Sequence, residues 1–263
     1  MKYYSTVLSL FVLPAVITLH FTACDDKVID PVRVETGGGN GGDTTNQNTG
    51  LPPGYELFGE NVEVYLDGDY IVIKSNGVPD HGSPYFDQSH EFYEAYNGNN
   101  PQFRLNPNRI REQNLTFRIP LHPVEAQNHS ATPMGPIGVS VNGVPFYNQY
   151  AAGGSPLAGE INSFDQYNGH PQQTGGYHYH VEPLSITAKV GKSSLLGFLL
   201  DGFPVYGPEE NAKVVTNDDL DDYHGHFGAT KEYPEGIYHY HITDADPYLN
   251  GAGYFGVKGT VSQ

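Results

Sequence analysis

Two copies of the tetrapeptide Tyr-His-Tyr-His, at 177–180 and 238–241, each place two histidines two residues apart. Side chains alternate between the two faces of a β-strand, so both histidines of a copy point one way and both tyrosines the other. Cβ atoms at positions i and i+2 lie roughly 6.5 to 7 Å apart. Imidazoles reaching from this spacing can converge on one ion with metal–nitrogen bonds of about 2.0–2.1 Å. The pattern therefore indicates transition-metal binding.

An upstream block adds one more histidine and one carboxylate to each tetrapeptide. Asp165 stands before His170 at the same spacing as Asp221 before His226. Three histidines and one aspartate are suitable ligands for Zn²⁺ or Cu²⁺. Each copy can bind its own ion, or the two strands can share one, and the sequence does not decide between these geometries. The predicted metal ligands are His170, His178, His180, His226, His239 and His241.

The same evidence allows an interpretation without metal. A buried ladder of tyrosine and histidine can satisfy its own hydrogen bonds across a sheet. One His-x-His would favour that interpretation, whereas two copies with matching upstream histidines favour the metal. His81 is a further candidate ligand. His224 is a weaker one, because its counterpart in the first copy is Asn168.

The chemistry-bearing blocks belong to a longer internal repeat. Asn142-Gly143-Val144-Pro145 precedes the first set and Asp201-Gly202-Phe203-Pro204 precedes the second, so three blocks recur in the same order. This order predicts a duplicated supersecondary unit. The Gly-Pro blocks are typical of turns, in which glycine takes a positive φ and proline fixes the exit. Asp201 suits an Asx turn as well as a functional carboxylate.

The two tetrapeptides, the Asp201 block and the segment 75–81 resemble the YHYH-domain family, which is named for the tetrapeptide. The resemblance covers roughly residues 60 to 258 and implies no particular activity. Some relatives carry a cysteine near the second Asp-x-x-x-Gly block. This chain has none there, which removes any thiol-dependent role.

Period-two alternation dominates the remainder, and 32 glycines with 20 prolines disfavour long helices. We therefore expect an all-β, β-sandwich-like domain with internal duplication and long loops. An Asp67-Gly68 turn predicts a hairpin of 62–66 with 70–74. One short helix is expected to start at Thr216, which suits an N-cap. Further strands are predicted at 115–119, 137–141, 185–190 and 195–200.

The first residues predict export. A basic start, a short apolar run and small residues before Cys24 are typical of a signal peptide over residues 1–23. Cys24 is the only cysteine, and its position resembles a bacterial lipobox, which implies lipidation. Residues 24–54 then form a flexible tether rich in Gly, Asn and Thr, and residues 55–263 form the YHYH domain. An anchored protein of the cell envelope, at the outer membrane or cell surface, is expected.

The net charge excludes one class of partner but does not decide the function. The chain carries −17 at pH 7, which argues against nucleic-acid binding. The membrane, through the lipid alone, is the one partner we expect; substrate and protein partners stay open. The leading hypothesis is a Cu- or Zn-binding protein without catalysis. The alternatives are a metal-dependent hydrolase or copper-dependent oxidoreductase, and a carbohydrate- or protein-binding surface module without metal. The candidate catalytic carboxylates are Asp165, Asp201 and Asp221.

Overall fold

The computed structural model describes residues 50–263. The predicted signal peptide at 1–23, the lipidated Cys24 and the tether up to residue 49 lie outside the described residues. Within the described part, strands make up several sheets and helices are short, which confirms the all-β prediction. None of the described helices is long and apolar enough to cross a membrane.

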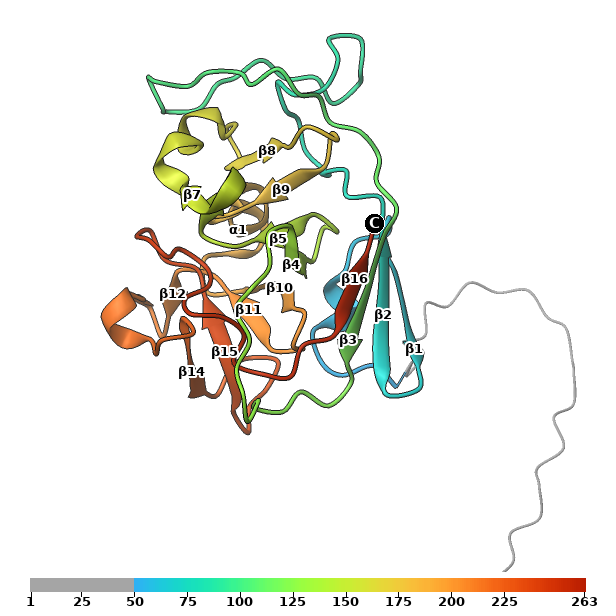
Figure 1. Cartoon of the computed structure of the whole chain (residues 1–263), viewed down its shortest axis with the longest axis vertical. Helices are drawn as coiled ribbons and strands as arrows, with labels where there is room; N and C mark the ends of the chain where they lie inside the picture. The colour runs from blue at the N-terminus through green and yellow to red at the C-terminus, as the bar shows by residue number, and fades with distance from the viewer. Residues whose placement is uncertain (1–49) are drawn as a thin grey trace, which may run out of the picture. The chain divides into compact units, whose positions relative to one another are not determined.

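The smaller of the two main sheets is antiparallel and contains the first and the last strand of the described chain (Figure 1). The predicted hairpin is confirmed, with Asp67 paired to Tyr70 across the Asp-Gly turn. In spatial order the strands are β1 (Glu63–Asp67), β2 (Tyr70–Ser75), β3 (Leu115–Pro120) and β16 (Thr260–Ser262). β3 buries alternate apolar side chains, as a period-two pattern requires, whereas β2 buries three consecutive ones, Ile71 to Ile73.

The larger sheet has eight strands and is built from two equivalent halves. Each half contains an antiparallel hairpin, a parallel neighbour and an outer antiparallel strand. Repeat 1 (136–180) contributes β4 (Pro136–Ser140), β5 (Pro145–Tyr147), β9 (Tyr177–Tyr179) and β8 (Gly169–Pro171). Repeat 2 (195–241) contributes β10 (Leu195–Leu199), β11 (Pro204–Tyr206), β15 (Ile237–His241) and β14 (Gly225–Gly228). The predicted duplication is thus visible in strand order and register.

The halves meet at β4 and β10, and Figure 1 shows the outer strands β8 and β14 at opposite ends of the sheet. Val139 pairs with Phe198 at the centre of this junction, so a local two-fold axis relates the repeats. Gly138 and Gly197 flank the centre, and a Cβ on either would overlap the partner strand's backbone. Only glycine allows the strands to pack this closely.

Each repeat also carries a small two-stranded hairpin, which lies along the chain between the second and third of its four strands in the large sheet. In repeat 1 this is β6 (Tyr150–Ala151) with β7 (Ser155–Pro156), and in repeat 2 it is β12 (Glu209–Glu210) with β13 (Lys213–Val214). A capping box at Thr216 confirms the predicted helix start, although the helix is one 3-10 turn. The 3-10 turns are η1 (Tyr55–Leu57), η2 (Ala152–Gly154), η3 (Leu157–Gly159), η4 (Ile161–Ser163) and η5 (Asn217–Asp219).

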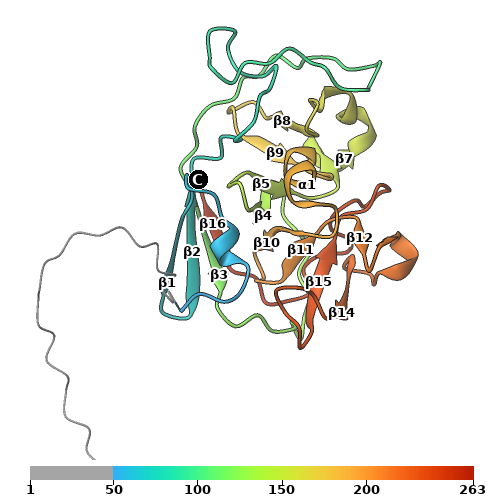
Figure 2. The same ribbon diagram turned by 180° about the vertical axis from the view of Figure 1, so that it is seen from behind.

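The strand predicted at 185–190 is wrong. This segment forms the α-helix α1 (Leu184–Val190), which lies on the near side of the large sheet in Figure 2. Pro183 precedes the helix and Gly191 ends it with a φ of 97°. Proline at the start and glycine just past the end are helix boundaries, and they outweigh the β-branched residues between them.

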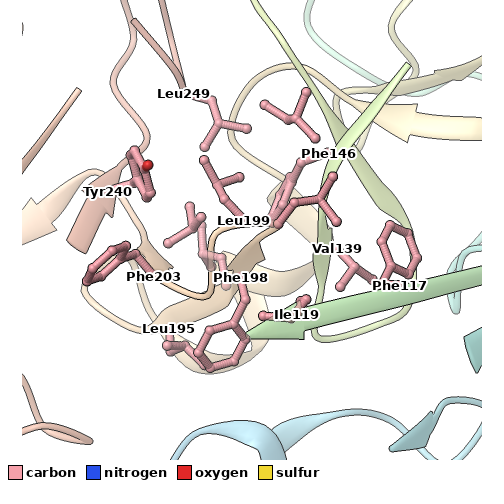
Figure 3. Packing of buried hydrophobic residues seen from close by; sticks show 14 of the residues in the cluster. Phe117, Ile119, Val139, Phe146, Leu195, Phe198, Leu199, Phe203, Tyr240 and Leu249 are labelled. Atoms are coloured by element: carbon pink, nitrogen blue, oxygen red, sulfur yellow. The ribbon is translucent and has the colours of Figure 1, made fainter. Parts of the chain in front are cut away.

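One hydrophobic core joins the two main sheets. Phe117 and Ile119 of β3 lie beside Val139 and Phe198 of the large sheet, as Figure 3 shows. All four side chains are fully buried. The core extends to Tyr240 of the second tetrapeptide, so the strand that carries two predicted ligands is held by the main core.

Candidate metal centres

The three predicted ligands of repeat 1 converge, and we call them centre 1. His170 on β8 pairs with His178 on β9, and His180 follows β9 on the same face. The Nε2 atoms of His170 and His178 lie 3.0 Å apart. One ligand atom from each of the three side chains lies within 4.8 Å of the others, and all three residues are buried.

Backbone carbonyls orient the imidazoles of centre 1. Nδ1 of His178 donates to the carbonyl of Gly176 at 3.1 Å, and Nδ1 of His180 donates to that of Asn148 at 2.5 Å. A carbonyl can only accept, so each Nδ1 carries the proton and each Nε2 keeps a lone pair in the neutral ring. The buried Nε2 of His180 has no partner among the described residues. Such outer contacts are typical of imidazoles that ligate metals.

His170 reaches the same state through a hydroxyl. Its Nδ1 lies 2.7 Å from Ser163 Oγ, and that hydroxyl also lies 2.8 Å from the carbonyl of Glu160. The single Ser163 proton satisfies the carbonyl, which leaves Nδ1 of His170 as the donor to Oγ. All three Nε2 atoms of centre 1 then present lone pairs to one another.

Repeat 2 has the same arrangement with an added carboxylate, and we call it centre 2. The Nε2 atoms of His226 and His239 lie 3.1 Å apart. His239 Nδ1 donates to the carbonyl of Ile237 at 3.0 Å, and His241 Nδ1 donates to that of Gly207 at 2.8 Å. His241 Nε2 is buried without a partner among the described residues, as in His180.

Glu210 on β12 completes centre 2. Its carboxylate oxygens lie 3.4 Å from Nε2 of His239 and 3.6 Å from Nε2 of His226. It belongs to the group whose ligand atoms all lie within 4.8 Å of one another. In centre 1 the nearest carboxylate is Glu160, 3.6 Å from His170 Nε2, and it is not a member of the corresponding group.

Burial favours the neutral form of the three imidazoles of centre 1 and of His239 and His241 in centre 2. It lowers the pKa of His170 to about 3 and that of His180 to about 4, and it lowers the pKa of His178 well below the ordinary value. In centre 2 burial lowers the pKa of His241 to about 4 and also lowers that of His239. Neutral imidazole is the form that ligates metal. In centre 1 the facing Nε2 lone pairs of His170 and His178 repel unless a cation or a proton lies between them.

The tyrosines on the opposite face hold the strands in place. Tyr177 OH donates to Asp165 at 2.8 and 2.9 Å, and Tyr238 OH donates to Asp221 at 2.9 Å. Each aspartate also accepts backbone N–H groups of the loop that leads to the Gly-His pair. The structure therefore does not bring Asp165 or Asp221 to the imidazoles; they shape the loop that presents His170 and His226.

The remaining candidates also lie outside both centres. Asp201 is fully buried and accepts from Tyr240 OH at 2.6 Å and from the Phe203 N–H, the Asx-turn contact. Burial raises the Asp201 pKa to about 6. His81 bonds with Tyr179 OH at 3.0 Å. His224 bonds through both ring nitrogens, to the carbonyl of His241 and the side chain of Asn217.

Sequence reasoning missed Glu210. A signal for it was present, because Glu210 follows Tyr206 by four residues, just as Ala151 follows Tyr147. Aligning the repeats would have shown an acidic residue in one copy and a small apolar one in the other. Asp165 and Asp221 are nearer to the histidines in sequence and were predicted instead, but they bond to tyrosines on the opposite face of the strands.

Comparison with known proteins agrees with the tetrapeptides. A family model described as "YHYH protein" matches residues 116–217 and 209–252, which together cover more than half of the chain. This chain belongs to the YHYH family. Neither a search of curated proteins nor one of solved structures gave a match.

The YHYH match includes every member of centres 1 and 2. It also includes the junction of β4 with β10, so the family region and the duplicated sheet coincide. The segment 75–81, which resembles the family by eye, lies before the matched residues.

Proposed function

We propose that this protein is an exported, lipid-anchored metal-binding protein that holds two ions of Cu²⁺ or Zn²⁺, one in each repeat. The observation that carries the proposal is the hydrogen bonding of the four tetrapeptide imidazoles. Each imidazole donates its Nδ1 proton to a backbone carbonyl, which leaves a lone pair on Nε2, and it lies within ligand distance of the other two histidines of its centre.

The spacing of the nitrogens supports the same proposal. Ligand atoms around a tetrahedral Zn²⁺ with bonds near 2.05 Å lie roughly 3.3 Å apart. The two closest pairs of Nε2 atoms lie 3.0 and 3.1 Å apart, and the other ligand atoms fall within 4.8 Å. Imidazole suits both Zn²⁺ and Cu²⁺, so the donor set favours this pair of metals over Mg²⁺ or Ca²⁺, which prefer oxygen.

Elemental analysis of protein purified without an affinity tag tests the proposal. We expect two equivalents of Cu or Zn in the wild type. One equivalent should remain in His178→Ala/His180→Ala and one in His239→Ala/His241→Ala, and none when the four changes are combined. The control is His90→Ala/His122→Ala, because both side chains are exposed and neither belongs to a centre. Metal-free wild type that unfolds unchanged in the presence of Cu²⁺ and Zn²⁺ would refute the proposal.

The anchor is proposed from the sequence alone and has its own test. Cys24 as the only cysteine after an apolar start supports lipidation. We expect the wild type in the membrane fraction of a bacterial host, labelled by radioactive palmitate. Cys24→Ser should lose the label and leave the membrane. Equal labelling of both forms would contradict the anchor and leave the metal proposal untouched.

A further inference from the structure

The two centres differ at one equivalent position. Ala151 and Glu210 are the second residues of the matching strands β6 and β12. Their alignment is supported by the preceding carbonyls, because His180 donates to that of Asn148 and His241 to that of Gly207, each one residue after the aligned tyrosine. Glu210 brings a carboxylate to centre 2, whereas the methyl group of Ala151 cannot ligate.

Glu160 does not take over this role in centre 1. It comes from the turn between η3 and η4 rather than from β6, and it approaches only His170. Its other carboxylate oxygen accepts the backbone N–H of Ala152 at 3.3 Å. Repeat 1 therefore offers three imidazoles where repeat 2 offers three imidazoles and a carboxylate.

Centre 1 also opens into a pocket of about 540 Å³ that all three histidines line. The rest of the lining is mostly side-chain amides, such as Asn108 and Gln172, and large side chains, such as Met134. No lysine or arginine lines it. The lining also includes one carboxylate, Glu160. A pocket of this size accepts a small molecule. Glu160 and the absence of lysine and arginine disfavour an anion, and a bound metal ion would disfavour a cation, so the lining suits an uncharged molecule.

A tyrosine hydroxyl marks the same contrast. The Tyr206 hydroxyl of repeat 2 is hydrogen-bonded, since it lies 2.7 Å from Thr230 Oγ1 and 2.9 Å from the carboxylate of Glu232. Its counterpart Tyr147 stacks on His178 at 4.0 Å and lines the pocket, and within residues 50–263 its hydroxyl has no hydrogen-bond partner. A donor is thus available beside centre 1.

We propose that the ion of centre 1 keeps an exchangeable coordination position that faces this pocket and takes a small, uncharged molecule through an oxygen or nitrogen atom, while centre 2 is closed by Glu210. This rests on the proposed function, because both centres must hold metal. Three protein ligands with an open position are typical of reactive zinc sites, and four protein ligands are typical of structural ones. Glu160 and the Tyr147 hydroxyl can accept from and donate to the incoming molecule.

Visible spectroscopy of the Co²⁺-loaded full-length protein tests the open position, with azide as the probe. Azide is a small anion that binds the ion directly, so it reports the open position and not the class of ligand, which is tested separately with imidazole and inorganic phosphate. One centre is retained at a time by His239→Ala/His241→Ala or by His178→Ala/His180→Ala. Azide should change the Co²⁺ bands of the protein that retains centre 1. It should leave the bands of the protein that retains centre 2 unchanged, and a response there instead would overturn the proposal.

Single substitutions in the intact chain provide a reciprocal test that does not depend on removing a centre. Ala151→Glu should weaken azide binding at centre 1 at least tenfold, because a carboxylate then occupies the position. Glu210→Ala should create a second azide response at centre 2. If neither substitution changes the azide titration, the position of Glu210 does not control access and the proposal fails.

The outcomes separate this inference from the proposed function. No Co²⁺ uptake by either single-centre protein refutes metal binding itself. Uptake by centre 1 without an azide response refutes only the open position. The class of ligand is tested with imidazole and inorganic phosphate. Imidazole should compete with azide, whereas phosphate should not, and stronger competition by phosphate would overturn the uncharged class.

Discussion

Repeat 1 and repeat 2 share strand order, register and three histidines, but they differ in how their centres are enclosed. Centre 1 is buried, lacks a carboxylate in its ligand group and opens into a pocket. Centre 2 carries Glu210, and its His226 is only partly buried. Duplication therefore preserved the strands that present the imidazoles, while the small hairpin beside them diverged. The β-sheet positions the imidazoles, and the small hairpin determines which other side chains approach them.

The largest expected effect is acid destabilisation of the metal-free protein. Histidine titrates near pH 6.5 when unfolded, whereas burial lowers the pKa of His180 and His241 to about 4. As pH falls below 6.5, the unfolded chain binds protons that the folded chain does not, so stability falls until about pH 4. Each of these groups contributes about 3 kcal/mol to the loss.

Urea unfolding at a series of pH values measures this loss and sharpens the comparison. His178→Gln/His180→Gln should flatten the pH dependence more than His239→Gln/His241→Gln. Burial lowers the pKa of His178 well below its ordinary value, whereas the Glu210 carboxylate opposes the lowering of the His239 pKa by burial. An equal slope in both variants would mean that the two centres are equally buried in solution.

The next effect concerns Asp201 and Asn142, the side chains that hydrogen-bond to the hydroxyls of Tyr240 and Tyr179. Asp201→Ala leaves Tyr240 OH and the Gly256 N–H without their buried acceptor and should cost about 3 kcal/mol of stability. The counterpart Asn142 is half-buried and bonds more weakly to Tyr179 OH, at 3.3 Å. Asn142→Ala should cost about 1 kcal/mol. Denaturant melts compare the two, and a larger loss in Asn142→Ala would reverse the assignment of the stronger anchor.

A smaller effect separates the two carboxylates. Glu210→Gln should weaken metal binding at centre 2 by about 10- to 100-fold, since a ligand with a full charge is removed. Glu160→Gln should change the affinity of centre 1 by less than about threefold, because Glu160 is outside its ligand group. Competition with a chromophoric chelator measures both affinities. Similar losses would make Glu160 a ligand and the centres alike.

The smallest effect concerns the paired tyrosines. Tyr206→Phe removes hydrogen bonds to Thr230 and Glu232 and should cost about 1 kcal/mol of stability. Tyr147→Phe keeps the stacking on His178 and removes a hydroxyl without a partner, so its cost should be close to zero. Thermal melts of the metal-free forms compare them. A clear loss in Tyr147→Phe would show that its hydroxyl is engaged after all.

Much of the fold followed from short-range signals. The Asp-Gly turn gave the β1–β2 hairpin, and alternation in the tetrapeptides placed histidines and tyrosines on opposite faces. The residues Ile186, Thr187 and Val190 favour a strand, so local propensity predicts the wrong structure for α1. Only its boundary residues, Pro183 and Gly191, indicate a helix. Which strands become neighbours depends on contacts between residues far apart in the sequence. Local patterns therefore do not predict the order of the strands in the large sheet, in which the two repeats run outward from β4 and β10.

The candidate site was predicted in part, for a similar reason. The six histidines group as two sets of three, which is one of the two geometries that the sequence left open. The carboxylate was misplaced because Asp165 and Asp221 are close in sequence yet bond to the tyrosine face. Glu210 reaches the imidazoles from a separate hairpin, and its approach is a tertiary contact that spacing along one strand does not encode.

The close packing of Gly138 against β10 and Gly197 against β4 has a consequence for the distance between the two centres. Both centres are carried by one continuous eight-stranded sheet, in which β4 and β10 approach each other closely at the two glycines that flank the symmetry axis. Their separation is thus a property of the backbone, insensitive to drift in side-chain size. If each centre is loaded with Cu²⁺, pulsed electron paramagnetic resonance should give a single, narrow distribution of the distance between the two spins.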